Sequence, residues 1–214
     1  MLKRKIESSI ISWIKNDKKA LLIDGARQVG KTFVIRKVLQ ELECDYIEFN
    51  LIQSPELVPL LTNSQLVDDM VTNLSLFTNK PFIKGKTFIF IDEIQEFKEI
   101  ATKVKFWVDE GSYRYVFSGS LLGVELKNIT SAPVGYLKTL TMYPMNFEEF
   151  LQLYNFTDSL KESLYKSFND RTPVNEAVHN RMMKIFNTYL CVGGMPGAVQ
   201  KFSDTKNLEL TMSE

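Results

Sequence analysis

The chain has 214 residues, of which 44% are hydrophobic and 24% are charged. This length and balance exclude a disordered chain and allow one sizeable core with a small appended subdomain. Lys and Arg total 26 and Asp and Glu total 26, so the formal net charge is +0. No overall field therefore draws the protein onto nucleic acid or an anionic membrane, although a local basic patch stays open.

The N-terminal segment starts with the basic run Met1–Lys5, but Glu7 and several serines interrupt what would be the apolar part of a signal peptide. Nowhere does the chain reach the roughly 18 uninterrupted apolar residues that a membrane span requires. We therefore expect a cytoplasmic protein with no membrane partner. Helical spacing predicts an amphipathic helix from Lys5 to Asp17.

The first strand is predicted at Ala20–Asp24, and the residues after it read GARQVGKT, a complete GxxxxGK[ST] loop. Such a loop surrounds phosphate groups with backbone N–H groups, and its glycines let the backbone approach closely. An ordinary strand-to-helix turn is the alternative, which the strand before the loop and the amphipathic helix after it disfavour. The residues expected to bind a nucleoside triphosphate are Gly25, Ala26, Arg27, Gln28, Val29, Gly30, Lys31, Thr32 and Phe33.

A helix is predicted from Lys31 to Glu43, and its first two residues have separate roles in the expected site. The N-terminal dipole of the helix would face the β-phosphate. Lys31 would reach the β- and γ-phosphates and is assigned a catalytic role, and the hydroxyl of Thr32 would ligate Mg²⁺.

A second strand is predicted at Asp45–Phe49 and a helical stretch at about Pro55–Leu76. The following strand pattern spans Lys86–Glu93, with an apolar run at its centre and the adjacent acids Asp92 and Glu93 at its end. A continuous apolar run is typical of a central parallel strand covered on both faces, and ligands bind beyond the carboxyl ends of such strands. The acids are therefore expected where Mg²⁺ would be.

The two acids suit different roles. In the additional-strand class of P-loop NTPases, the first acid orients the metal and the next polarises the water that attacks the γ-phosphate. We assign Asp92 to the metal and Glu93 to catalysis. The alternative, an acidic pair at a helix N-terminus, is disfavoured by the intact phosphate loop.

Helical spacing returns from Phe97 to Glu110, and a strand follows at Tyr113–Phe117. Alternating strands and helices predict an α/β fold, a parallel sheet flanked by helices. The strand runs into Ser118–Ser120, at the same sheet edge as the phosphate loop. A γ-phosphate sensor would lie at Ser118 or Ser120, unless these serines only end the strand and cap a helix.

Another strand is predicted from Lys138, and Asn146 is expected to cap a helix. The rest of the chain reads as helical until the glycines and proline of Cys191–Gly197. We therefore expect a P-loop core at residues 1–145 and a small α-helical lid subdomain at residues 146–214. Elsewhere in the chain, Cys44 and Cys191 are too isolated for a disulfide framework or a metal site and are expected to be buried hydrophobes.

Together these motifs resemble the bacterial and archaeal AAA+-like P-loop ATPases of the AAA_14 type, whose core usually precedes a C-terminal domain of unknown function, DUF4143. The resemblance spans nearly the whole chain. The matching segments are GARQVGKT at 25–32, IDEIQ at 91–95, SGSLLG at 118–123, YPMNFEEF at 143–150, and YL with GGMP within 189–196.

The resemblance implies ATP and Mg²⁺ as cofactors, and the chain departs from it in two places. Family members commonly carry Arg or Lys after the glycine that follows the sensor, whereas this chain has Gly135–Tyr136, with Lys138 two positions later. The source of the finger residue, a basic side chain that would neutralise negative charge on the phosphates, is therefore open. Members also continue beyond the GGMP segment, so the chain is expected to be truncated or to be a short member.

The expected function is that of a Mg²⁺-dependent ATPase acting as a molecular switch or motor, because a pure binding scaffold would not require Glu93. The alternative is a non-hydrolysing ATP-binding module that controls a partner, as would follow if the activating cation comes from another subunit of a homo-oligomer. A GTPase is disfavoured because Asn79–Phe82 lacks the aspartate of the NKxD signature. A small-molecule kinase is disfavoured because the helical tail offers only Arg171 and Arg181.

The macromolecular partner is left open between nucleic acid and protein. Nucleic acid is favoured by analogy with related ATPases. A local basic patch could be formed by Lys3, Arg4, Lys5, Lys18 and Lys19.

Overall fold

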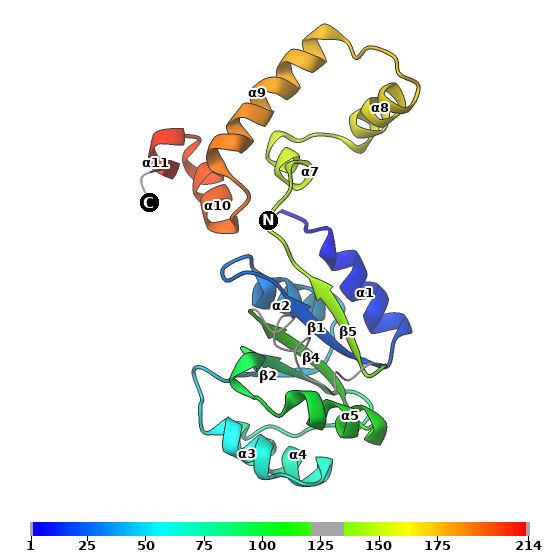
Figure 1. Ribbon diagram of the computed structural model, residues 1–214, viewed down its shortest axis with the longest axis vertical. Coiled ribbons are helices and arrows are strands. Elements are labelled where there is room, and N and C mark those ends of the chain that lie inside the picture. The colour runs from blue at the N-terminus through cyan, green and yellow to red at the C-terminus, as the bar shows by residue number, and fades with distance from the viewer. Residues whose placement is uncertain (1, 121–134, 213–214) are drawn as a thin grey trace. The chain divides into compact units, whose positions relative to one another are not determined.

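The computed structural model describes residues 2–120 and 135–212. Contacts divide the chain into two compact units (Figure 1). One unit is Ile6–Met142, and the other combines Met1–Lys5 with Tyr143–Glu214. The sequence predicted a division at residue 145, whereas the structure divides after Met142 and groups the first five residues with the C-terminal part of the chain.

A sheet of five parallel strands forms the centre of the Ile6–Met142 unit (Figure 1). The strand order is β2-β3-β4-β1-β5. β4 thus lies between β1, which leads into the phosphate loop, and β3, which ends in Asp92, so the additional-strand class is confirmed. The strands are β1 Ala20–Asp24, β2 Tyr46–Asn50, β3 Phe88–Asp92, β4 Arg114–Gly119 and β5 Leu137–Thr141.

Helices cover both faces of this sheet. The single helical stretch predicted at 55–76 is two helices, which separate near Ser64. A short 3₁₀-helix, η1, follows β3 at Ile94–Glu96. The α-helices of this unit are α1 Ile6–Asn16, α2 Lys31–Glu41, α3 Leu57–Asn63, α4 Val67–Thr78 and α5 Ile100–Glu110.

One face of the sheet packs against α3, α4 and α5 through a large apolar core. At its centre the ring of Trp107 on α5 stacks on Tyr115, with centroids 5.4 Å apart, and on Phe97 at 6.0 Å. The other face packs against α1, where Trp13 meets Phe88 edge-on at 6.1 Å. Because both faces are covered, β1 and β3 are apolar up to their last residues, Asp24 and Asp92, as the sequence predicted.

The second unit is helical and has its own apolar core around the fully buried Phe150. Asn146 accepts a hydrogen bond from Glu149 N, and the Glu149 side chain accepts one from Asn146 N, so the predicted cap is confirmed as a capping box. The helices of this unit are α7 Phe147–Phe150, η2 Leu151–Tyr154, α8 Asp158–Asn169, α9 Glu176–Val192, α10 Pro196–Thr205 and α11 Leu208–Met212.

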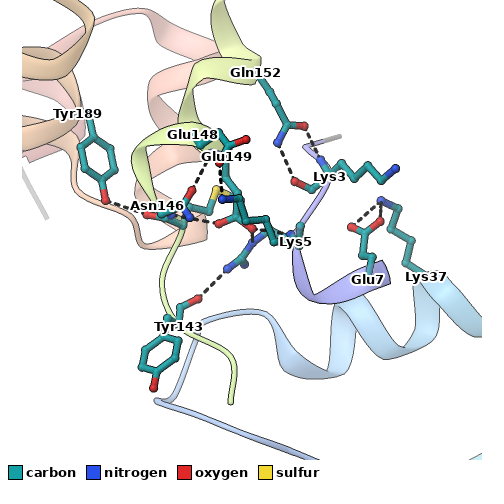
Figure 2. A network of polar contacts seen from close by, with 12 residues as sticks. Lys3, Lys5, Glu7, Lys37, Tyr143, Asn146, Glu148, Glu149, Gln152 and Tyr189 are labelled. Atoms are coloured by element: carbon teal, nitrogen blue, oxygen red, sulfur yellow. Dashed lines mark hydrogen bonds and ion pairs between the residues drawn. The ribbon is translucent and has the colours of Figure 1, made fainter. Parts of the chain in front are cut away.

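The N-terminal segment is held in this helical unit by polar contacts (Figure 2). Arg4 Nε donates to Glu149 Oε1 at 3.1 Å, and both side chains are buried. The guanidinium of Arg4 also donates to the carbonyl of Tyr143 at 2.7 Å. Lys3 and Gln152 exchange two further bonds. Residues at the two ends of the sequence thus form one packing unit.

The two cysteines differ from their expected surroundings. Cys191 is exposed and Cys44 is half-buried, so the prediction that both are buried was wrong. Among the described residues, no helix is long and apolar enough to cross a membrane.

Candidate functional site

The phosphate loop connects β1 to α2 and has a backbone that its sequence explains. Gly25 has φ 148°, and a Cβ there would lie 2.2 Å from the carbonyl oxygen of Met142, so only glycine fits. Gln28 adopts a left-handed conformation with φ 64°, and Gly30 does so with φ 92°. No side chain caps the N-terminus of α2. Its first backbone N–H groups are therefore available to an anion, as a phosphate site requires.

Lys31 lies at the centre of this loop. Its Nζ donates to the carbonyl oxygens of Gly25 at 2.9 Å and Ala26 at 2.8 Å. Burial lowers the pKa of Lys31 from its ordinary value, and the nearby carboxylates of Glu93 and Asp92 oppose that shift. Lys31 is thus a buried cation that donates to two neutral backbone carbonyls. Charged phosphate oxygens are stronger acceptors and could replace those carbonyls.

Thr32 and Asp92 meet where the loop faces the end of β3. Thr32 Oγ1 donates to Asp92 Oδ2 at 3.0 Å, and the Asp92 side chain is almost fully buried. Ser118, at the end of β4 and fully buried, donates its hydroxyl to Asp92 Oδ1. The parallel sheet explains this meeting, since β1, β3 and β4 all end at the same edge.

Asn50 is a site residue that the sequence analysis missed. It is the last residue of β2 and lies directly opposite Asp92 in the parallel register. Its Nδ2 donates to Asp92 Oδ2 at 3.1 Å. Its Oδ1 accepts from the backbone of Ile52 and Gln53, which fixes the amide orientation. The sequence did contain a signal for Asn50, because it is a polar residue directly after a strand pattern, and such residues lie at this edge of the sheet.

Glu93 follows Asp92 in an unusual backbone conformation. Its φ is 57° and its ψ 44°, the left-handed region that a non-glycine residue adopts at a cost of about 1–2 kcal/mol. Such strain gathers at functional sites. The side chain is half-buried, and its Oε2 accepts a 2.6 Å hydrogen bond from Gln95 Nε2.

The remaining site residues occupy different surroundings. Ser120 is buried, and its backbone N–H donates to Gln95 Oε1 at 3.3 Å. Ser118 bonds to Asp92 through its side chain, whereas Ser120 bonds to Gln95 through its backbone, so the two sensor candidates are not equivalent. Arg27 and Phe33 are both exposed at the loop and the first turn of α2.

The oxygen groups around Asp92 fit a magnesium ion by their chemistry. Mg²⁺ takes oxygen ligands and is commonly held by one or two carboxylates together with substrate phosphates. The site offers the Thr32 hydroxyl and the Asp92 carboxylate within 3.0 Å of each other. Asn50 and Ser118 orient that carboxylate from two further directions, as groups behind a metal ligand do.

The segment where the resemblance predicts a basic residue is only partly described. Leu121–Gly123 and Pro133–Val134, which belong to the predicted sensor and finger segments, lie outside the described residues. Tyr136 lies under the ammonium group of Lys105, 5.7 Å from the ring centroid. Lys138 pairs with Asp17 at 3.5 Å. Lys138 is therefore engaged in an ion pair next to α1.

Comparison with known proteins agrees with this geometry. The family AAA_14, described as an AAA domain, matches residues 17–151, which include the loop, the acids and β5. No curated protein matches the chain.

Two solved structures show the same fold. A Walker-type ATPase of Pyrococcus abyssi, PABY2304, is 17% identical with a TM-score of 0.57, and the match covers 99% of this chain and 70% of that one. The Drosophila ORC bound to DNA is 14% identical with a TM-score of 0.53, and the match covers 98% of this chain and 63% of that one. At these identities the likeness shows the fold of a P-loop ATPase.

Proposed function

Because the chain belongs to the AAA_14 family of AAA domains, we propose that it binds and hydrolyses ATP in a Mg²⁺-dependent manner and acts as a molecular switch or motor. The observation that carries the proposal is the contact between the loop and β3. Thr32 and Asp92 hydrogen-bond to each other, with Lys31 and Glu93 beside them. These four side chains fit four of the roles in ATP binding and hydrolysis: phosphate binding, two groups at the metal, and activation of water.

The residues of the loop would bind and orient the nucleotide. Lys31 would exchange its two carbonyl partners for phosphate oxygens, and the uncapped N–H groups at the start of α2 would hold the same phosphates. Thr32 and Asp92 would hold Mg²⁺, with Asp92 kept in place by Asn50 and Ser118. A bound Mg²⁺ would supply positive charge against the phosphates.

Hydrolysis would depend on Glu93. Its carboxylate would accept a proton from the attacking water while Asp92 stays committed to the metal. Ser118 and Ser120 are proposed to sense the γ-phosphate, Ser118 through its bond to Asp92 and Ser120 through Gln95. The helical unit is proposed to serve as a lid.

A partner macromolecule is proposed to use the energy of hydrolysis. The similar ORC structure is bound to DNA, which supports nucleic acid, whereas the net charge of +0 gives no general attraction to it. The finger residue would come from a second subunit in a homo-oligomer, since Tyr136 stands at the expected position in this chain. A cytoplasmic location is proposed with this function.

The test is phosphate release from ATP in the presence of Mg²⁺, measured across protein concentration. The proposal predicts turnover, and specific activity that rises with concentration would show that subunits complete one another's sites. Tight ATP binding with no turnover at any concentration would favour the non-hydrolysing regulatory module.

A further inference from the structure

The side chain of Gln95 bridges two strand ends in the candidate site. Its Nε2 donates a 2.6 Å hydrogen bond to Glu93 Oε2, and its Oε1 accepts a 3.3 Å hydrogen bond from Ser120 N. Gln95 lies in η1 directly after β3, and Ser120 directly follows β4. The carboxamide of Gln95 therefore links Glu93, which is expected to activate water, with Ser120 at the end of the expected sensor strand.

The partners of this carboxamide fix its orientation. A backbone N–H can only donate, so Ser120 selects the oxygen of Gln95. A carboxylate can only accept, so Glu93 selects the nitrogen. The reversed amide would lose both bonds and would place its oxygen against the carboxylate. Glutamine satisfies both neighbours at once, which neither glutamate nor methionine can do.

The end of β4 leaves room for this side chain. A Cβ on Gly119 would lie 2.8 Å from Gln95 Oε1 and 3.1 Å from Ile94 Cγ2. Real Cβ atoms do not approach a neighbour as closely as 2.8 Å, so any larger residue would displace the carboxamide. The backbone of Gly119 is not left-handed. Glycine at this position therefore leaves the carboxamide of Gln95 undisturbed.

Glu93 depends on this contact for its orientation. Its backbone is left-handed, and its side chain is half-buried at the sheet edge. Among the described residues, Gln95 donates a hydrogen bond to its carboxylate. Without that bond the side chain would sample other rotamers, and a displacement of about 1 Å in a catalytic group can lower a rate by about a hundredfold.

We propose that Gln95 is a positioning residue for Glu93, which it orients toward the attacking water and couples to the sensor strand through Ser120. The inference rests on the proposed ATPase function. Because Gln95 donates its hydrogen bond to Glu93 Oε2, the other oxygen, Glu93 Oε1, accepts the proton that leaves the water. The water oxygen then bonds to the γ-phosphorus, and the bond from that phosphorus to the bridging oxygen of ADP breaks.

The first test compares Gln95→Met with wild type. Methionine keeps the length of the side chain and removes both hydrogen bonds. We expect kcat for ATP hydrolysis to fall by about 10- to 100-fold, with the Kd for ATP unchanged, because the contact orients Glu93 and does not bind nucleotide. Hydrolysis at the wild-type rate would overturn the proposal, as would a loss confined to ATP affinity.

A second variant displaces the carboxamide without altering Gln95. Gly119→Ala is expected to lower kcat in the wild-type background because its methyl group collides with Gln95 Oε1. In the Gln95→Met background the same change should cause little further loss, since the bonds are already gone. Equal losses in the two backgrounds would show that Gly119 acts independently of Gln95 and would count against the proposal.

A third readout is independent of activity. The side-chain amide signal of Gln95 in an NMR spectrum can be identified by its disappearance in Gln95→Met. It should move in Glu93→Ala, where the carboxylate acceptor is lost, and an unmoved signal would contradict the contact. If wild type hydrolyses no ATP, the proposed ATPase function fails, while this comparison still decides whether Gln95 holds Glu93.

Discussion

Thr32 Oγ1 and Asp92 Oδ2 lie 3.0 Å apart, although 60 residues separate them in the sequence. Thr32 is placed by the loop that follows β1, and Asp92 by the end of β3, with β4 between these two strands. The direct hydrogen bond brings together a hydroxyl and a carboxylate that suit a magnesium ion.

Removing the Thr32 hydroxyl should therefore weaken magnesium binding. Thr32→Val keeps the shape of the side chain and loses the oxygen, so the apparent Mg²⁺ affinity during ATP binding should fall by at least about tenfold. Thr32→Ser keeps the hydroxyl and is the matched control. Titration of ATP binding against Mg²⁺ measures the effect. Equal Mg²⁺ dependence in Thr32→Val and Thr32→Ser would exclude Thr32 from the metal site.

Lys31→Ala should reduce ATP affinity by about a hundredfold or more. Two charge-assisted hydrogen bonds to phosphate would be lost, each worth about 1.5–3 kcal/mol. Lys15→Ala, which removes an exposed lysine from α1, is the control for a change in net charge. Calorimetric titration with ATP compares the two variants. An affinity loss of the same size in both would show that Lys31 acts only through overall charge.

Tyr115→Phe should stabilise the protein by about 1 kcal/mol. The hydroxyl of Tyr115 is buried and has no hydrogen-bond partner among the described residues, which leaves its desolvation uncompensated. Its ring, stacked on Trp107, is retained in phenylalanine. The free energy of unfolding in denaturant measures the change. A loss of stability would reveal a partner for the hydroxyl.

The same variant has a predictable pH dependence. Burial raises the pKa of Tyr115 above its ordinary value of 10.0. Above pH 10 the unfolded chain therefore releases a proton that the folded protein keeps, so wild type loses stability as the pH rises. The advantage of Tyr115→Phe should grow in that range, and an advantage that shrinks above pH 10 would contradict the assignment.

The adjacent acids of α7 should differ strongly in their contribution to stability. Glu149 accepts from Arg4 Nε, Lys5 N and Asn146 N, and its ion pair with Arg4 is buried. Glu149→Ala should cost about 3–5 kcal/mol, since a buried charge loses its partner. Glu148→Ala breaks a partly exposed pair with Lys5 and should cost about 0–1 kcal/mol. Chemical denaturation compares them, and equal costs would refute the distinction.

The fold was largely predictable because its strands carry strong local signals. Ala20–Asp24 and Phe88–Asp92 are apolar runs that end in a phosphate loop and an acid, and the sheet covers both of their faces. Boundaries were less accurate where the signal was weak. The second strand was predicted to end at Phe49, one residue before Asn50, and the site residue Asn50 was missed for that reason.

Contacts between distant segments could not be predicted from the sequence. Arg4 and Glu149 are 145 residues apart, and no local pattern indicates that the first residues group with the helical unit. The left-handed backbone of Glu93 could not be predicted either, because glutamate has no preference for that conformation. The role of Gln95 needed the position of Ser120, which only the strand order supplies.

The most direct test of the proposed function is to compare wild type with Glu93→Gln in ATP binding and in phosphate release. The variant keeps the size of the side chain and removes its ability to accept a proton. We predict that ATP binds to both with similar Kd, while phosphate release by the variant falls by about 100-fold or more. Phosphate release at the same rate by both would contradict the catalytic role of Glu93.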